Sequence, residues 1–178
     1  MSNLEKITIR SAVVADLPVM FKLMDDALES SSDDDPTEQR LKRWSTRFYE
    51  DSPFIFYVAV TDNKNMIGWC SGRQTLECNR TVGDQTYDCE VGHMFILKQY
   101  RHRGIGRELW KVVWNDVLMR FHPKNFIVWS VDKEQTHKFY LSLGGTPIGK
   151  KNVEDTVLTA YVWSDLKLYD ATTFLIFK

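Results

Sequence analysis

The hydrophobic and polar positions of this 178-residue chain follow two periods, which divide it into predicted helices and strands. Apolar residues recur every three or four positions over residues 16–28 and 105–121, which predicts a helix in each stretch. Asp35 followed by Pro36 is typical of a cap and first turn, which predicts another helix over residues 36–49. A shorter helix is expected after Asp132, which can serve as its N-cap, and should end at Gly144. Apolar, β-branched and aromatic runs predict strands at residues 7–10, 54–60, 66–73, 87–97, 125–131 and 156–163, with one more after the last helix.

The order of these elements predicts a mixed α/β fold with helices around a central sheet. The turn sequence TDNKN joins two of the strands, which is typical of a hairpin. A hydrophobic fraction of 43%, with 10 Phe, 7 Tyr and 6 Trp, supplies enough apolar surface for a packed core. We expect residues 1–178 to form a single domain.

Charge and cysteine usage narrow the class of protein. A net charge of -1 gives no reason to expect nucleic acid or a membrane surface as a partner. The sequence contains no apolar run of about 20 residues and no apolar core of a signal peptide, so a cytoplasmic protein is expected. Cys70, Cys78 and Cys89 lack the spacing of a disulfide framework or a zinc site, and the histidines lack that of metal ligands. We therefore expect no metal.

Positive charge is concentrated in the stretch YRHRGIGRELW, residues 100–110, where a predicted strand gives way to a helix. Gly104 and Gly106 allow a tight turn, and the first turn of a helix presents spare N–H donors with a partial positive charge. This arrangement suits a diphosphate, although a glycine turn with solvated arginines before a core helix gives the same pattern. The basic side chains of the stretch are Arg101, His102, Arg103 and Arg107.

The stretch RHRGIG matches the phosphate motif Gln/Arg-x-x-Gly-x-Gly/Ala of the GNAT acetyltransferase superfamily at Arg101, Gly104 and Gly106. Residues 9–20 resemble the first strand and helix of that family, and residues 129–145 resemble its fifth strand and the following helix. Since these motifs occur in order over nearly the whole chain, it is identified as a member of the family. The resemblance implies a mostly antiparallel central sheet of six or seven strands, flanked by about four helices.

The resemblance also implies acetyl-CoA as a co-substrate, with its pyrophosphate on the backbone amides of the glycine motif. The strand end before the motif should hold the pantetheine arm through main-chain groups, as an added strand would be held, and it can be a core strand as well. Lys133 stands where the family commonly has Asn, and Gly145 where it has Phe. The candidate cofactor-binding residues are Met94, Phe95, Ile96, Leu97, Arg101, His102, Arg103, Gly104, Ile105, Gly106, Arg107 and Lys133.

The implied reaction needs a base and an acid. Neutralising an alkyl ammonium at pH 7 costs about 4.6 kcal/mol, so a base that acts directly or through water is useful. Glu90 resembles the glutamate of the protein-acetylating branch; the alternative is a surface or salt-bridged residue. Alternation along the strand places Gly92 on the face of Glu90, leaving room for a ligand, and His93 on the opposite face, in the core or behind the site. Tyr140 matches the family tyrosine that protonates the coenzyme A sulfur; alternatively, it is a half-buried aromatic.

The amine that accepts the acetyl group is the part of the function that the sequence predicts least well. The expected function is acetyl transfer to a primary amine of a small molecule, by direct attack in a ternary complex. The alternatives are a protein lysine or N-terminal acetyltransferase, or a non-catalytic acyl-CoA-binding module on the same fold. Asp33, Asp34 and Asp35 could attract a cationic amine, or form a solvated turn. Trp44 and Trp69 are core residues or aromatic walls of the site. Dimers are frequent in the family, so the resemblance adds a homodimer to the expectations.

Overall fold

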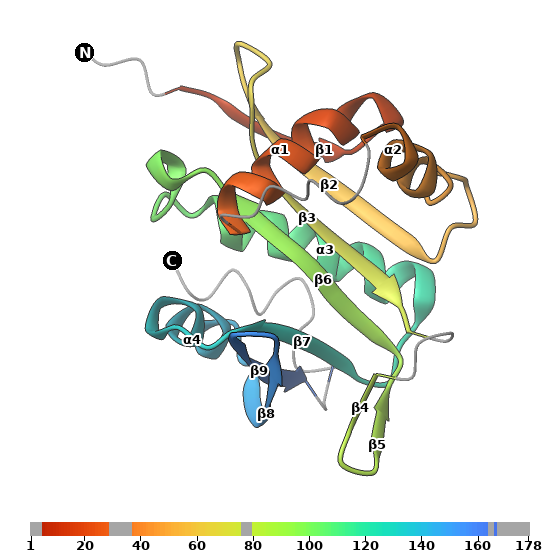
Figure 1. The fold of residues 1–178 in the computed structure, drawn as a ribbon, viewed down its shortest axis with the longest axis vertical. Coiled ribbons are helices and arrows are strands. Elements are labelled where there is room, and N and C mark those ends of the chain that lie inside the picture. The colour runs from red at the N-terminus through yellow and green to blue at the C-terminus, as the bar shows by residue number, and fades with distance from the viewer. Residues whose placement is uncertain (1–4, 29–36, 76–79, 164–165, 167–178) are drawn as a thin grey trace. The chain divides into compact units, whose positions relative to one another are not determined.

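The computed structural model describes residues 5–28, 37–75, 80–163 and 166. A mostly antiparallel seven-stranded sheet has the strand order β1-β2-β3-β6-β7-β9-β8, and β4 pairs with β5 in a separate small sheet (Figure 1). The chain divides into two compact units, one of residues 1–71 and 93–113 and the other of residues 72–92 and 114–178. The predicted α/β class, with a mostly antiparallel sheet of six or seven strands and about four helices, is confirmed in the described residues. That residues 1–178 act as one domain stays a prediction.

The first unit holds the N-terminal strands and helices. Strands β1 and β2 are antiparallel, with Ile7 opposite Thr61 and Ser11 opposite Tyr57. The elements that begin in this unit are β1 (Ile7–Ser11), a 3₁₀ turn η1 (Val14–Asp16), α1 (Leu17–Leu28), α2 (Thr37–Ser45), β2 (Phe54–Thr61), β3 (Met66–Gln74), a 3₁₀ turn η2 (Lys98–Tyr100) and α3 (Ile105–Phe121).

Aromatic side chains from helices and strands form the core of the first unit. The Trp69 ring on β3 is fully buried, and its Nε1 donates a hydrogen bond to the Met20 carbonyl of α1 at 3.0 Å. Trp44 of α2 meets Phe21 of α1 edge-on, with ring centroids 5.3 Å apart. Trp44 and Trp69 are thus core residues, which was one of their two interpretations from the sequence. The buried members of this core are Leu17, Met20, Phe21, Leu23, Trp44, Phe56, Val58 and Trp69.

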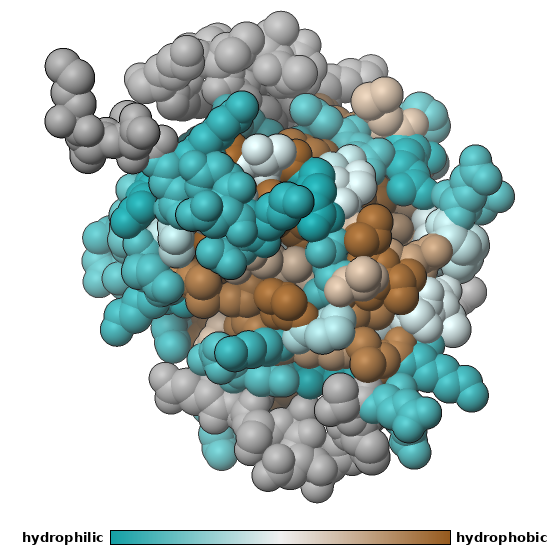
Figure 2. Space-filling model, turned by 90° about the horizontal axis from the view of Figure 1, so that it is seen from above, coloured by the Kyte–Doolittle hydropathy of each residue, from teal (hydrophilic) through white to brown (hydrophobic). Residues whose placement is uncertain are grey.

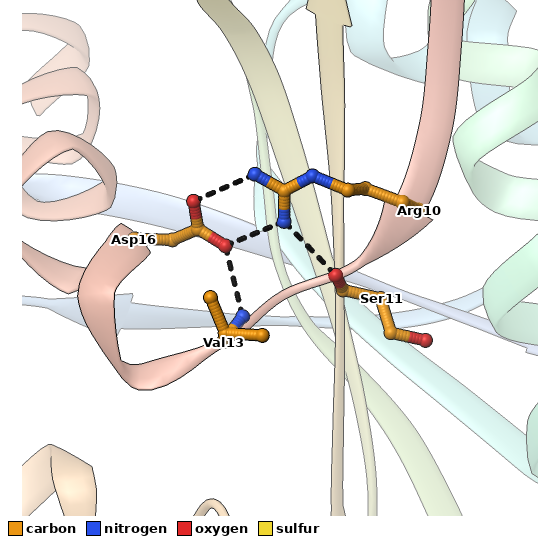
Figure 3. Close-up of polar contacts among 4 residues, drawn as sticks. All are labelled: Arg10, Ser11, Val13 and Asp16. Carbon is orange, nitrogen blue, oxygen red and sulfur yellow. Dashed lines mark hydrogen bonds and ion pairs between the residues drawn. The ribbon is translucent and has the colours of Figure 1, made fainter.

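The chain enters α1 through a charged turn. The Arg10 guanidinium donates to both Asp16 carboxylate oxygens, at 2.7 and 2.9 Å, and the Val13 N–H donates to the same carboxylate at 2.8 Å (Figure 3). The hydrogen bond from Arg10 is the main reason why the pKa of Asp16 lies below its usual value. The Asp16 side chain therefore accepts from the N-cap residue of η1, Val13, and does not cap α1, which begins at Leu17.

In the second unit, strand β7 precedes the short helix α4 in the chain, and strands β8 and β9 follow it. Strand β6 begins here and pairs in parallel with β7, with Cys89 opposite Phe126 and Val91 opposite Val128. The elements that begin in this unit are β4 (Arg80–Val82), β5 (Gln85–Tyr87), β6 (Cys89–Ile96), β7 (Phe126–Val131), α4 (Glu134–Ser142), β8 (Thr146–Val153) and β9 (Thr156–Trp163). Strand β8 confirms the additional strand expected after α4.

The Trp163 ring at the end of β9 packs against Gly145. It is 1% exposed, and its Nε1 donates to the Leu143 carbonyl at 2.9 Å. A Cβ built on Gly145 would lie 2.7 Å from Trp163 Cζ2 and 3.1 Å from the Tyr140 carbonyl oxygen. The glycine is therefore needed because the indole occupies the space into which a side chain at residue 145 would extend.

The structure corrects three local predictions. The N-cap of α4 is Lys133 rather than Asp132, because the Asp132 carboxylate instead binds Lys150 Nζ at 2.5 Å and Thr159 Oγ1 at 3.0 Å. Helix α2 ends at Ser45 rather than near residue 49. The Ser45 hydroxyl there bonds back to a carbonyl of its own helix, which competes with helix continuation. The β4–β5 hairpin was not predicted, because each of its strands has only three residues.

Hydrophobic side chains also reach the surface (Figure 2). Met119 of α3 is the most exposed of the large ones described, at 75%. Among the residues that the structure describes, no helix is long and apolar enough to cross a membrane.

We predict that Gly145→Ala destabilises the protein by about 1–3 kcal/mol, because the added methyl group overlaps a rigid ring. Gly149→Ala is the matched control, since a Cβ there would meet Val82 Cγ1 at 3.4 Å, an ordinary contact distance. Denaturant unfolding measures both. Equal stability of the two variants would contradict this explanation of Gly145.

Candidate active site

The turn between β6 and α3 has an unusual backbone. It passes through η2, then His102 with φ 61° and Gly104 with φ 81°, before α3 begins at Ile105. Positive φ costs glycine little, whereas for histidine it is uncommon and must be held by the surrounding chain. Both residues are exposed, so the turn projects its backbone into solvent.

The end of this turn is the N-terminus of a long helix. The first helical hydrogen bond runs from the Glu108 N–H to the Gly104 carbonyl at 3.1 Å. The N–H groups of Ile105 and Gly106 precede it, so the helix itself offers them no acceptor, and they carry the positive end of its dipole. A Cβ on Gly104 would meet nothing within 4 Å, which leaves space for a ligand atom at that point.

Positive side chains surround the turn. Arg101 and Arg103 are exposed, and Arg107 is half-buried. Arg101 Nε donates to the Ile96 carbonyl at 3.0 Å, which ties this guanidinium to the end of β6. The Arg103 guanidinium lies 5.1 Å from the centroid of the Tyr100 ring. The structure thus gathers the predicted residues from Arg101 to Arg107 in one cationic turn, and its chemistry fits a pyrophosphate.

The end of β6 offers main-chain groups on one edge. The Leu97 N–H donates to the Ile67 carbonyl of β3 at 2.9 Å. Because neighbouring residues of a strand direct their main-chain groups to opposite edges, Met94 and Ile96 direct theirs away from β3. The parallel register with β7 covers Cys89 to Val91, and both residues lie beyond it along β6. Their position is compatible with the predicted contact to a pantetheine arm.

Glu90 lies in a buried ion pair. Its side chain is 4% exposed, and Arg73 Nε donates to its Oε1 at 2.5 Å. The Arg73 side chain is 22% exposed. Of the two interpretations that the sequence left open, the ion pair is observed, and the role of Glu90 as a base stays a prediction.

Tyr140 lies on α4 among aromatic rings and is 5% exposed. Its ring centroid is 5.0 Å from that of Tyr161, whose hydroxyl is 3.0 Å from His137 Nδ1. Burial, and secondarily the charge of Asp132, raises the pKa of Tyr161. Lys133, the N-cap residue of α4, is exposed and makes no side-chain capping bond. Glu90, Lys133 and Tyr140 belong to the second unit, whereas the turn and the end of β6 belong to the first.

His93 is the titratable residue whose surroundings the sequence did not reveal. It is half-buried on β6, and its Nδ1 lies 3.0 Å from the Ser71 hydroxyl oxygen of β3. The rings of Trp69 and Trp44 lie 5.2 and 5.5 Å from the imidazole, measured between centroids. The partners are distant in the sequence, and no local pattern could have indicated them.

Among the described residues, the other reactive groups do not form a second centre. Cys70 and Cys89 are buried, as predicted for packing residues, and burial raises the pKa of both thiols, that of Cys89 to about 12. In the described part of the chain, no group of three or more His, Cys, Asp or Glu residues could hold a metal ion. Asp33, Asp34 and Asp35 lie outside the described residues.

Comparison with solved structures places the fold among N-acetyltransferases. A mutant of spermidine N-acetyltransferase SpeG from Vibrio cholerae superposes with a TM-score of 0.68 at 12% identity, over 93% of this chain and 98% of that chain. YncA from Salmonella typhimurium, solved with its cofactor acetyl-CoA, gives 0.66 at 18% identity, over 88% and 92%. At these identities the likeness concerns the fold alone.

Comparison of sequences identifies the family. No curated protein matches the chain. A family model described as the acetyltransferase (GNAT) family matches residues 19–145, which is more than half of the chain and includes the whole of the cationic turn. The protein therefore belongs to the acetyltransferase (GNAT) family and is an acyltransferase.

Proposed function

We propose that the protein transfers the acetyl group of acetyl-CoA to a primary amine of a small molecule, by direct attack in a ternary complex. The observation that carries this proposal is the cationic turn at the start of α3, with Gly104 at φ 81° and an open space beside it. A turn of this kind binds anions through backbone N–H groups, and membership of the family supports the pyrophosphate of acetyl-CoA as the anion.

Each part of the candidate site has a proposed role. Ile105 and Gly106 donate their N–H groups to the pyrophosphate, and Arg101 and Arg103 add positive charge. The main-chain groups of Met94 and the N–H of Ile96 bind the pantetheine arm as an added strand would be bound, whereas the Ile96 carbonyl accepts from Arg101 Nε. Phe95 and Leu97 alternate with them and face the core of the first unit. His102, Arg107 and Lys133 stay candidates for phosphate contacts.

The acid of the reaction is Tyr140 in this proposal. A thiol leaving group has a pKa near 8.5, so one proton donor is sufficient help. A ring packed against Tyr161 and Trp163 holds its hydroxyl in a fixed direction. The sequence names Glu90 as the proton acceptor, and that assignment has to be tested against its ion pair with Arg73.

A small amine is the preferred acceptor because spermidine N-acetyltransferases are among the proteins that share this fold closely. The proposal includes a cytoplasmic location and, as in many family members, a homodimer. Acetyl-CoA is the co-substrate, and no metal is needed for the steps assigned.

The acceptor class is tested by following coenzyme A release from acetyl-CoA with a panel of polyamines, amino acids, aminoglycosides and lysine-containing peptides. We expect turnover with one class of small amine. Turnover with peptides alone would replace the proposal with protein acetylation. Acetyl-CoA binding without turnover on any acceptor would favour a binding module.

We predict that Tyr140→Phe lowers kcat about 100-fold or more, because the sulfur loses its proton donor while the ring packing is kept. The dissociation constant of acetyl-CoA, measured by calorimetry, should not change. Tyr87→Phe, which removes a hydroxyl from another buried tyrosine, is the matched control. A kcat for Tyr140→Phe within about twofold of the wild-type value would remove Tyr140 from the mechanism.

A further inference from the structure

The surroundings of His93 differ from those of an ordinary core histidine. The imidazole is half-buried rather than enclosed, and it belongs to the same unit as the cationic turn. Its Nδ1 lies 3.0 Å from Ser71 Oγ. Trp69 and Phe95 contribute ring neighbours from β3 and β6, with centroids 5.2 and 6.2 Å away, and Trp44 contributes one from α2 at 5.5 Å.

We propose that His93 accepts the proton of the attacking amine, an inference that rests on the proposed acetyl transfer. When Nδ1–H donates to Ser71 Oγ, the lone pair of the imidazole lies on Nε2, and that atom can take the proton. Ser71 is 4% exposed, and in the proposed tautomer its hydroxyl oxygen accepts from Nδ1–H. Ser71 is thus a positioning residue for His93.

The aromatic neighbours favour the protonated product. A cation within about 6 Å of an aromatic face is attracted by the electron density of the ring. Trp44 and Trp69 both lie within that range of the imidazole. In this proposal, the two tilted indole rings favour the imidazolium that proton transfer forms.

Two of the described charged groups contact rings of the aromatic core. On the α2 side, the Arg47 guanidinium lies 4.5 Å from the Trp44 ring centroid. On the α1 side, Arg40 lies over Phe21 and is paired with Asp25.

Glu90 is less suited to accept this proton. It follows from strand alternation that Glu90 and His93 project from opposite faces of β6. Glu90 Oε1 is engaged by Arg73, and the carboxylate is almost fully buried. Taking a proton would discharge Glu90 and leave Arg73 without its anionic partner, which is costly for a buried pair.

The step balances as follows. The lone pair of the amine nitrogen forms a bond to the thioester carbonyl carbon, and the carbon–sulfur bond breaks with its electron pair on sulfur. The nitrogen passes its proton to His93 Nε2, and the sulfur receives a proton from Tyr140. His93 then releases its proton to water, and Tyr140 regains one.

The experiment compares kcat against pH for the wild-type protein, His93→Gln and Glu90→Gln, using the amine that the acceptor panel identifies. We expect the wild-type kcat to fall on the acidic side of its pH profile, where the imidazole becomes protonated and can no longer accept a proton. In His93→Gln this acidic limb disappears, and kcat at pH 8 falls about 100-fold. Glu90→Gln should lower the melting temperature and keep the acidic limb.

Two further variants separate chemistry from folding. His122→Asn changes an exposed histidine and should leave kcat and its pH profile unchanged. Ser71→Ala keeps the imidazole but removes the partner of Nδ1, so the acidic limb should persist with a shifted midpoint and a lower kcat. The KM for acetyl-CoA should not change in His93→Gln or Ser71→Ala, and this readout excludes a general structural defect.

Different results would overturn different parts of the account. An acidic limb shared by the wild type and His93→Gln, or a limb lost only in Glu90→Gln, would remove His93 as the proton acceptor and leave acetyl transfer standing. If acetyl-CoA binds but no amine is acetylated, the slow hydrolysis of acetyl-CoA is measured in the same variants. Water then takes the place of the amine, and His93→Gln should again lose rate and the acidic limb. A wild-type protein that does not bind acetyl-CoA would overturn the transfer reaction and this inference together.

Discussion

Positive backbone φ in the turn between β6 and α3 is the constraint from which the candidate site follows. His102 and Gly104 turn the chain so that α3 begins at Ile105. The turn places the positive end of a 17-residue helix, whose first N–H groups have no acceptor within the helix, beside the exposed residues 101–104. The arginines add charge to this site, but the backbone direction comes from the glycine. A straight continuation of the strand would present no such group of donors.

Strand β6 connects this turn to the proposed chemistry. The side chains of Phe95 and Leu97 pack on the aromatic core. The main-chain groups of Leu97 point toward β3, and those of Met94 and Ile96 point to the edge away from β3. His93 shares the face of Phe95, so the proposed proton acceptor is held by the same rings that stabilise the first unit. Packing and function are therefore expected to be coupled in the aromatic cluster around Trp69.

The sequence predicted those parts of the structure that depend on local pattern. Helix α3 begins at Ile105 as expected, because its apolar period is long and Gly104 precedes it. Contacts between distant residues were not predictable in this way. The Arg73–Glu90 pair spans 17 positions and the Ser71–His93 bond spans 22, and period-two patterning assigns a residue to a face without naming its partner there. Asp132 failed as a predicted cap for the same reason, since Lys150 and Thr159 compete for its carboxylate.

The most direct test of the central claim is the acetyl-CoA affinity of the wild type, Gly104→Ala and Gly83→Ala, measured by calorimetry. Both glycines have positive φ, at 81° and 60°, and a Cβ on either would meet nothing within 4 Å, so the strain of substitution is comparable. The account predicts similar losses of stability and a weakening of at least about tenfold, or 1.4 kcal/mol, in Gly104→Ala alone. Equal affinity in all three proteins, or no binding by the wild type, would contradict it.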